Sequence, residues 1–166
     1  MVMRIGDTLR RAMLLLAVAA SGAVAQTAGM PGVKDIWQPA PTPAGGLSWA
    51  LLESTRVIDR RDAHAMVFSR PGFPATVAAL AGRRVIVAGY MMPLDPTAGQ
   101  KHFVLLGYPP GCPYHLHAMP NQFVEVYAAR PIPLDETNRT VIAGTLRLTG
   151  QDESGIFYRL DDARRG

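Results

Sequence analysis

The residues of this sequence best suited to chemistry lie together in the stretch GCPYHLHAMPNQ, residues 111–122. It contains the chain's single cysteine, Cys112, followed by His115, His117 and Met119. Thiolate and imidazole are the commonest protein ligands for zinc and copper, and two intervening residues let one tight turn direct Cys112 and His115 at the same ion. If the segment is extended, His115 and His117 project to the same side. The spacing predicts a transition-metal site, with zinc ahead of copper.

Further donors would be needed to complete such a site. His102, on the preceding predicted strand, and Met119 are the nearest candidates, and water or a donor from a partner protein are alternatives. A cysteine, a histidine and a methionine in this order between two strands also resemble the ligand loop of cupredoxins. The Pro109-Pro110-Gly111 run before the cysteine departs from the cupredoxin pattern.

Two other interpretations of Cys112 stay open. The thiol could be buried or redox-active, with His115 lowering its pKa, or the whole segment could be a polar proline-rich loop. The sequence contains no G-x-S-x-G and no H-E-x-x-H motif, which disfavours an ordinary hydrolase. Whether the protein is an enzyme stays uncertain from these residues, and the balance favours a protein without catalytic activity.

The first 25 residues have the pattern of a secretory signal peptide. Arg4, Arg10 and Arg11 precede an apolar run, and Ala23-Val24-Ala25 ends it with a small-x-small cleavage pattern. We therefore predict a periplasmic protein without a transmembrane anchor once residues 1–25 are removed. An exported chain usually pairs its cysteines, so the unpaired Cys112 should be buried, bound to a metal or joined to another molecule.

The charge and length of the mature protein limit its possible partners and its number of domains. Cleavage removes three of the 17 basic and one of the 13 acidic residues, leaving 14 against 12. This small and scattered excess excludes a nucleic-acid surface. Residues 26–46 are rich in Pro, Gly and Ala and predict a flexible leader, and residues 47–166 are long enough for one domain.

A mainly β domain is expected to position the candidate ligands of residues 111–122. A short helix is expected after the N-cap candidate Ser48, and a second between Pro74 and Gly82. Five alternating, β-branched stretches follow, separated by turn residues: RRVIVAGYMM, KHFVLLGY, NQFVEVYA, TVIAGTLRLTG and GIFYRLDD. We predict a small five-stranded, OB-like antiparallel barrel with one or two short flanking helices, and bends at Gly89 and Gly144. Between Asp59 and Arg70 the signals are mixed.

From about Phe73 to its end the sequence resembles the DUF3299 family of exported bacterial proteins of unknown function. The resemblance rests on Gly82, Gly89-Tyr90, Pro93-Leu94, the strand from His102-Phe103 to Leu106, Cys112-Pro113, Pro120, Val124-Glu125-Val126, Gly144-Thr145-Leu146, Tyr158 and Leu160. It implies an exported OB-like barrel with metal-associated or transport-associated roles. His115 stands where relatives can have a second cysteine, which argues against dithiol redox chemistry and is neutral or favourable for metal.

Two functions are consistent with these observations. The first is a periplasmic protein that binds zinc or copper through Cys112, His115 and His117, with His102 or Met119, for metal handling or as a structural site. The second is a metal-free OB-like interaction module of an envelope or transporter complex, with the Cys-Pro loop as its contact surface. Its partner would be an envelope transporter or, for the first function, a metal-delivery protein.

Overall fold

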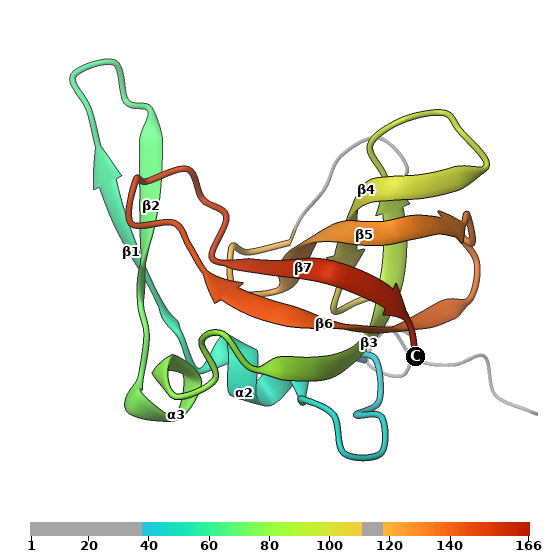
Figure 1. Cartoon of the computed structure of the whole chain (residues 1–166). Coiled ribbons are helices and arrows are strands. Elements are labelled where there is room, and N and C mark those ends of the chain that lie inside the picture. Colours follow the sequence, from blue (N-terminus) through green and yellow to red (C-terminus); the bar gives the residue numbers. More distant parts are fainter. Residues whose placement is uncertain (1–37, 111–117) are drawn as a thin grey trace, which may run out of the picture. The chain divides into compact units, whose positions relative to one another are not determined.

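The computed structural model describes residues 38–110 and 118–166 of the chain (Figure 1). Within these ranges it is mainly β, with two short helices, as the sequence predicts. In chain order the elements are α2 (Trp49–Glu53), β1 (Arg56–Arg61), β2 (Val67–Gly72), α3 (Ala75–Ala78), β3 (Arg84–Pro93), β4 (Gly99–Leu106), β5 (Phe123–Pro133), β6 (Arg139–Leu148) and β7 (Tyr158–Arg165). No helix in the described ranges is long and apolar enough to cross a membrane.

The last five strands form a closed barrel, and each corresponds to one of the five predicted stretches. Their order is β3-β4-β5-β7-β6, and β6 pairs again with β3. Figure 1 shows β7 between β5 and β6. Because β5 and β6 run in opposite directions, the strand inserted between them must be parallel to one, and it is parallel to β5. The barrel is therefore mixed, with one parallel pair in a predominantly antiparallel fold.

Alternating apolar side chains fill the barrel interior. On β3 these are Val85 and Val87, and on β6 they are Ile142 and Leu146, while the residues that alternate with them, such as Ile86 and Thr145, are less buried. A Cβ added to Gly89 would lie 2.6 Å from the Leu106 carbonyl oxygen. Gly89 is thus a position where the barrel wall leaves no room for a side chain.

Helix α2 packs against the barrel through its two buried residues. The Ser48 hydroxyl accepts a hydrogen bond from the Leu51 amide and caps the helix, as predicted. Five residues are too few to be helical in isolation, so packing must stabilise them. Trp49 and Leu52 are buried, and the Trp49 indole Nε1 donates to the Ala88 carbonyl at 2.7 Å. The Tyr158 hydroxyl donates to the Leu52 carbonyl at 2.6 Å, which joins α2 to β7.

The region with mixed sequence signals forms a hairpin of β1 and β2. Its strands pair antiparallel from Arg56 with Gly72 to Arg61 with Val67. Charged residues interrupt the apolar alternation of both strands, which is why the sequence pattern does not predict them. The hairpin contacts the β6–β7 connection through an ion pair between Arg60 and Glu153 and through a bridge between Ser69 and Ser154.

The end of the predicted leader contacts the domain within the described residues. Ala40 is buried, and its amide donates to the Gly107 carbonyl at 2.7 Å. The Leu47 amide donates to the Ile86 carbonyl at 2.8 Å. Ala40 therefore packs on the domain although most of residues 38–46 are exposed, and the packed part of the chain includes a residue before Leu47.

Candidate binding surface

The predicted metal ligands divide into two groups. Cys112, His115 and His117 lie outside the described residues. His102 lies on β4, and Met119 lies just before β5 with 48% of its surface exposed. Among the described residues there is no group of three or more His, Cys, Asp and Glu side chains arranged to hold a metal ion. The predicted metal site is thus not tested by the geometry of the described part of the chain.

The base of the segment between β4 and β5 is well anchored. The Gly107 amide donates to the Gln122 carbonyl at 2.9 Å, and the Gln122 amide donates to the Met119 carbonyl at 2.8 Å. The Asn121 side-chain amide donates to the carbonyls of Glu53 and Thr55 at 3.1 and 2.9 Å. Both ends of the segment are therefore fixed to the barrel, and one of them also to the end of α2.

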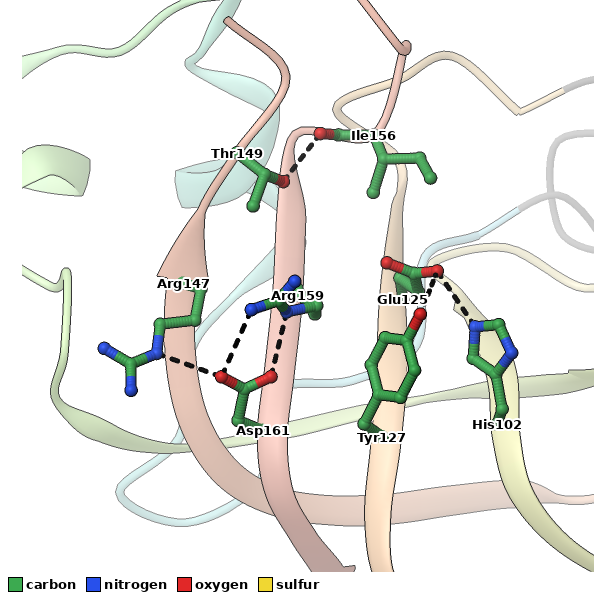
Figure 2. A network of polar contacts seen from close by, with 8 residues as sticks. All are labelled: His102, Glu125, Tyr127, Arg147, Thr149, Ile156, Arg159 and Asp161. Carbon is green, nitrogen blue, oxygen red and sulfur yellow. Dashed lines mark hydrogen bonds and ion pairs between the residues drawn. The ribbon is translucent and has the colours of Figure 1, made fainter. Parts of the chain in front are cut away.

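His102 belongs to a polar group on the outer face of the sheet. Its Nε2 lies 2.9 Å from Oε1 of Glu125, and its ring stacks on Tyr127 with centroids 4.3 Å apart and planes 16° apart. The Tyr127 hydroxyl donates to the same Glu125 oxygen at 3.2 Å (Figure 2). His102 and Tyr127 are directly paired across β4 and β5. His102 is four residues from Leu106, where β4 ends, or about 13 Å along the strand.

A second polar group lies next to it on β6 and β7. The two carboxylate oxygens of Asp161 accept from the Arg159 guanidinium, with Nε 2.9 Å from Oδ1. Arg147 Nε donates to the other oxygen at 3.0 Å. The Arg159 guanidinium also lies 5.7 Å from the centre of the Tyr127 ring, a cation–π contact. Tyr127 thus joins the two groups into one surface that extends from β4 across β5 and β7 to β6, which Figure 2 shows from close by.

A bulge in β7 shapes one side of this surface. Between Leu160 and Ala163 the strand has one residue more than β5 has between Val126 and Ala128. The chain accommodates it with a left-handed backbone at Asp162, φ +48°, which is uncommon for a residue other than glycine. A shallow depression lies here, lined by Tyr127, Ala128, Ala129, Arg159, Asp161 and Asp162. Strained backbone at a bulge is often found beside binding sites.

Two ionisable groups on the surface have shifted pKa values. Burial by itself would raise the pKa of Asp161, but hydrogen bonds from Arg159 and Arg147 outweigh it and hold that pKa below its usual value. Burial, reinforced by the nearby Glu125 carboxylate, raises the pKa of Tyr127. Asp161 is therefore ionised and Tyr127 protonated at neutral pH.

The sequence pattern identified only part of this surface. Alternation places Glu125 outward between Val124 and Val126, and the structure agrees, but the Glu125 side chain is only 15% exposed because His102 and Tyr127 lie against it. Tyr127, Arg147, Arg159 and Asp161 were not among the predicted site residues. Alternation also puts these four on outward faces, but their proximity depends on the insertion of β7 between β5 and β6.

We define the outer polar surface as the side chains of His102, Glu125, Tyr127, Arg147, Arg159 and Asp161. The barrel that displays it has the strand arrangement of a small OB-like fold, in which the second and third barrel strands, here β4 and β5, form the usual ligand-binding face. The described part of the chain is therefore an OB-like barrel with a polar network on its outer face.

Comparison with known proteins agrees with the resemblance in the sequence. The family model described as "Protein of unknown function (DUF3299)" matches residues 51–162, so the chain belongs to the DUF3299 family. The chain is similar to the crystal structure of a DUF3299 family protein from Pseudomonas aeruginosa PAO1, with 21% identity and a TM-score of 0.45. This match covers 77% of the present chain and 85% of the other. No curated protein matches the chain.

Proposed function

We propose that this protein is an interaction module of the cell envelope that binds a partner protein through the outer polar surface and its depression. The observation that supports this most is the joined network of His102, Glu125, Tyr127, Arg159 and Asp161 beside the strained Asp162. An arrangement needed only for solubility would not require side chains held in register across four strands. Aromatic and arginine side chains are also enriched at protein interfaces.

The proposed binding site lies on the outside of the barrel because the interior is already filled. The interior of the barrel is filled with apolar side chains, so a ligand must bind outside. On the outside, Tyr127 is 42% exposed although its ring contacts His102 and Arg159. An aromatic side chain that is ordered yet half exposed loses little conformational entropy when a partner covers it.

Site-specific photo-crosslinking tests the proposal. Ala129 lines the depression and is exposed, so p-benzoylphenylalanine can replace it without displacing a core residue. Ala63, also exposed and in the hairpin, provides a matched control position. In cells that express the protein normally, we expect one discrete crosslinked product at position 129 that is absent at position 63. Absence of a product at position 129, or equal products at both positions, would overturn the proposal.

Metal binding by Cys112, His115 and His117, with His102 or Met119, is a second proposal. One observation supports a ligand role for His102: Nε2 contacts the Glu125 carboxylate, and metal-binding histidines usually direct their second ring nitrogen to such a group. A fixed segment base would also reduce the entropy lost when the chain encloses an ion.

Metal analysis tests this second proposal independently of the first. After purification and dialysis, one equivalent of zinc or copper that is lost in Cys112→Ser supports the metal site. Metal-free protein whose unfolding is unchanged by chelator contradicts it. His102→Phe is the informative second variant, because it keeps a ring against Tyr127 but removes both nitrogen donors. A metal content unchanged in that variant excludes His102 from the ligand set.

A further inference from the structure

The charged residues that line the depression are Arg159, Asp161 and Asp162, and three arginines outside the lining contact these two aspartates. Together the four arginines are only partly neutralised by the aspartates. Arg147 and Arg159 are directly opposite each other in the β6–β7 pairing, and like charges in this relation repel. Asp161 contacts both of them and compensates one positive charge. Arg147 and Arg159 carry two positive charges, and among the described residues the carboxylate that contacts both is that of Asp161. One positive charge of this arginine pair is therefore not compensated by these contacts.

Asp162, the residue after Asp161, also lies between two arginines. Asp162 Oδ2 lies 3.5 Å from an Arg84 nitrogen, and Oδ1 lies 3.4 Å from an Arg164 nitrogen. The bulge makes this possible, because it lets the consecutive residues Asp161 and Asp162 each contact two arginines. Glu125, the carboxylate on the β5 side, is already occupied by His102 and Tyr127. Four guanidinium groups therefore share Asp161 and Asp162.

We infer that the arginines on and beside the depression bind an acidic segment of the partner protein, with one carboxylate for each arginine pair. This inference rests on the proposed function and names the chemistry of its partner. Guanidinium groups bind carboxylates through two parallel hydrogen bonds, and the shared aspartates hold the arginines in place beforehand. Arg147 uses only Nε in its contact with Asp161, so its terminal nitrogens can donate to a ligand.

A protein segment fits this surface better than a lipid bilayer does. Peripheral membrane binding combines basic residues with apolar side chains that enter the bilayer. Tyr127 is the one large, exposed hydrophobic residue among those that line the depression, whereas Met66, Val67, Leu94 and Met119 lie on other elements.

A peptide-binding measurement tests the inference directly. The probe is a fluorescein-labelled hexaglutamate peptide, and its anisotropy is followed on titration with the purified protein at low ionic strength. We expect saturable binding that weakens as salt is added, since salt screens the charges. The double variant Arg147→Gln, Arg159→Gln should bind at least about tenfold more weakly, with Arg147→Lys intermediate because lysine keeps the charge but loses the planar fork.

Control variants decide whether the effect is local. Arg61→Gln removes an exposed arginine from the hairpin and should leave peptide binding unchanged. An equal loss in Arg61→Gln and in the double variant would mean general electrostatic attraction and would overturn the inference. Binding of phosphatidylglycerol vesicles that depends on Arg147 and Arg159, without binding of the peptide, would also overturn it.

The crosslink at position 129 separates this inference from the proposed function. If the crosslink forms in the parent protein and disappears in the double arginine variant, both are supported. If it persists in the double variant with unchanged yield, acidic recognition is wrong while the binding surface stands. If it never forms in the parent protein, the proposed function itself fails. Thermal unfolding of the double variant verifies that lost binding does not result from lost folding.

Discussion

The side of the barrel covered by α2 and the outer polar surface are built on opposite principles. Against the barrel, Trp49, Leu52 and Tyr158 are fully or almost fully buried, and the Trp49 indole and the Tyr158 hydroxyl both contact main-chain carbonyls, the latter also the buried Thr55 hydroxyl. On the outer polar surface, ion pairs are partly exposed, and side chains bond to one another instead. The first arrangement stabilises the fold. Ion pairs exposed to this degree typically contribute little to stability, so the second arrangement is expected to matter less for folding than the first.

The largest effect should come from removing the indole that covers the barrel. We expect Trp49→Ala to reduce the free energy of unfolding by about 3–5 kcal/mol, because it leaves a cavity and frees the Ala88 carbonyl. Urea denaturation measures the loss. Trp49→Phe keeps the ring but not the hydrogen bond and should lose less. A loss below about 1 kcal/mol for the alanine variant would show that α2 does not stabilise the barrel as described.

Overpacking of the barrel wall should have the next largest effect. In Gly89→Ala the new methyl group would lie 2.6 Å from the Leu106 carbonyl oxygen, and we expect a loss of about 1–3 kcal/mol. Gly99→Ala is the matched control, since its nearest neighbour is the Pro131 Cβ at 3.0 Å and only a small shift would be needed. Equal stability of the two variants in thermal unfolding would contradict the close approach of β3 and β4.

Tyr158 should give the barrel a dependence on high pH. Burial raises the pKa of its hydroxyl to about 12, against an ordinary value of 10.0. Above pH 10 the unfolded chain loses this proton and the folded chain keeps it, so stability should fall as pH rises from 10 to 12. Tyr158→Phe should be less stable at neutral pH and show a shallower fall.

The comparison of the parent and Tyr158→Phe pH profiles separates the contribution of Tyr158 to the pH dependence of stability from that of Tyr108. Burial and the Glu53 carboxylate raise the pKa of Tyr108 to about 12 as well, so Tyr108 contributes to both profiles. The difference between parent and variant contains the Tyr158 contribution alone. Parallel profiles for the two proteins would contradict the burial of its hydroxyl.

The smallest stability effect should come from the outer polar surface. Asp161→Asn leaves Arg147 opposite Arg159 without the shared charge, yet these side chains are partly exposed, and we expect a loss below about 1 kcal/mol. The loss should shrink in high salt, which screens the repulsion between the arginines. Chemical denaturation in urea at two salt concentrations measures it. A loss as large as that of Trp49→Ala would show that this surface maintains the fold.

Much of the fold could be predicted from local sequence patterns. Alternation and turn residues gave the five barrel strands, and Ser48 and Pro74 marked the starts of both short helices. The hairpin of β1 and β2 was not predicted, because charged residues break its alternation and contacts with the distant β6–β7 connection help to hold it. A hairpin of this kind depends on tertiary contacts that no local pattern records.

The candidate site was less predictable than the fold. The sequence drew attention to His102 as a metal ligand, which stays a prediction, but it did not show that His102 contacts Glu125 and stacks on Tyr127. Arg159 reaches Tyr127 only because β7 pairs in parallel with β5. The left-handed backbone at Asp162 accompanies the register shift in β7; aspartate tolerates this conformation, but the local sequence does not show where the shift falls. Binding by Cys112, His115 and His117 stays a prediction from the sequence.

Hydroxyl-radical footprinting compares the exposed surfaces most directly. Tyr127, Met66 and Met119 are 42%, 60% and 48% exposed and report on the outer polar surface, the hairpin and the segment before β5. The rate of oxidation of each is measured in intact cell envelopes and in the purified protein. We predict that Tyr127 is protected in the envelopes while Met66 is oxidised equally in both. Equal oxidation of Tyr127 in both samples, with protection of Met66 or Met119 alone, would contradict the assignment of the binding surface.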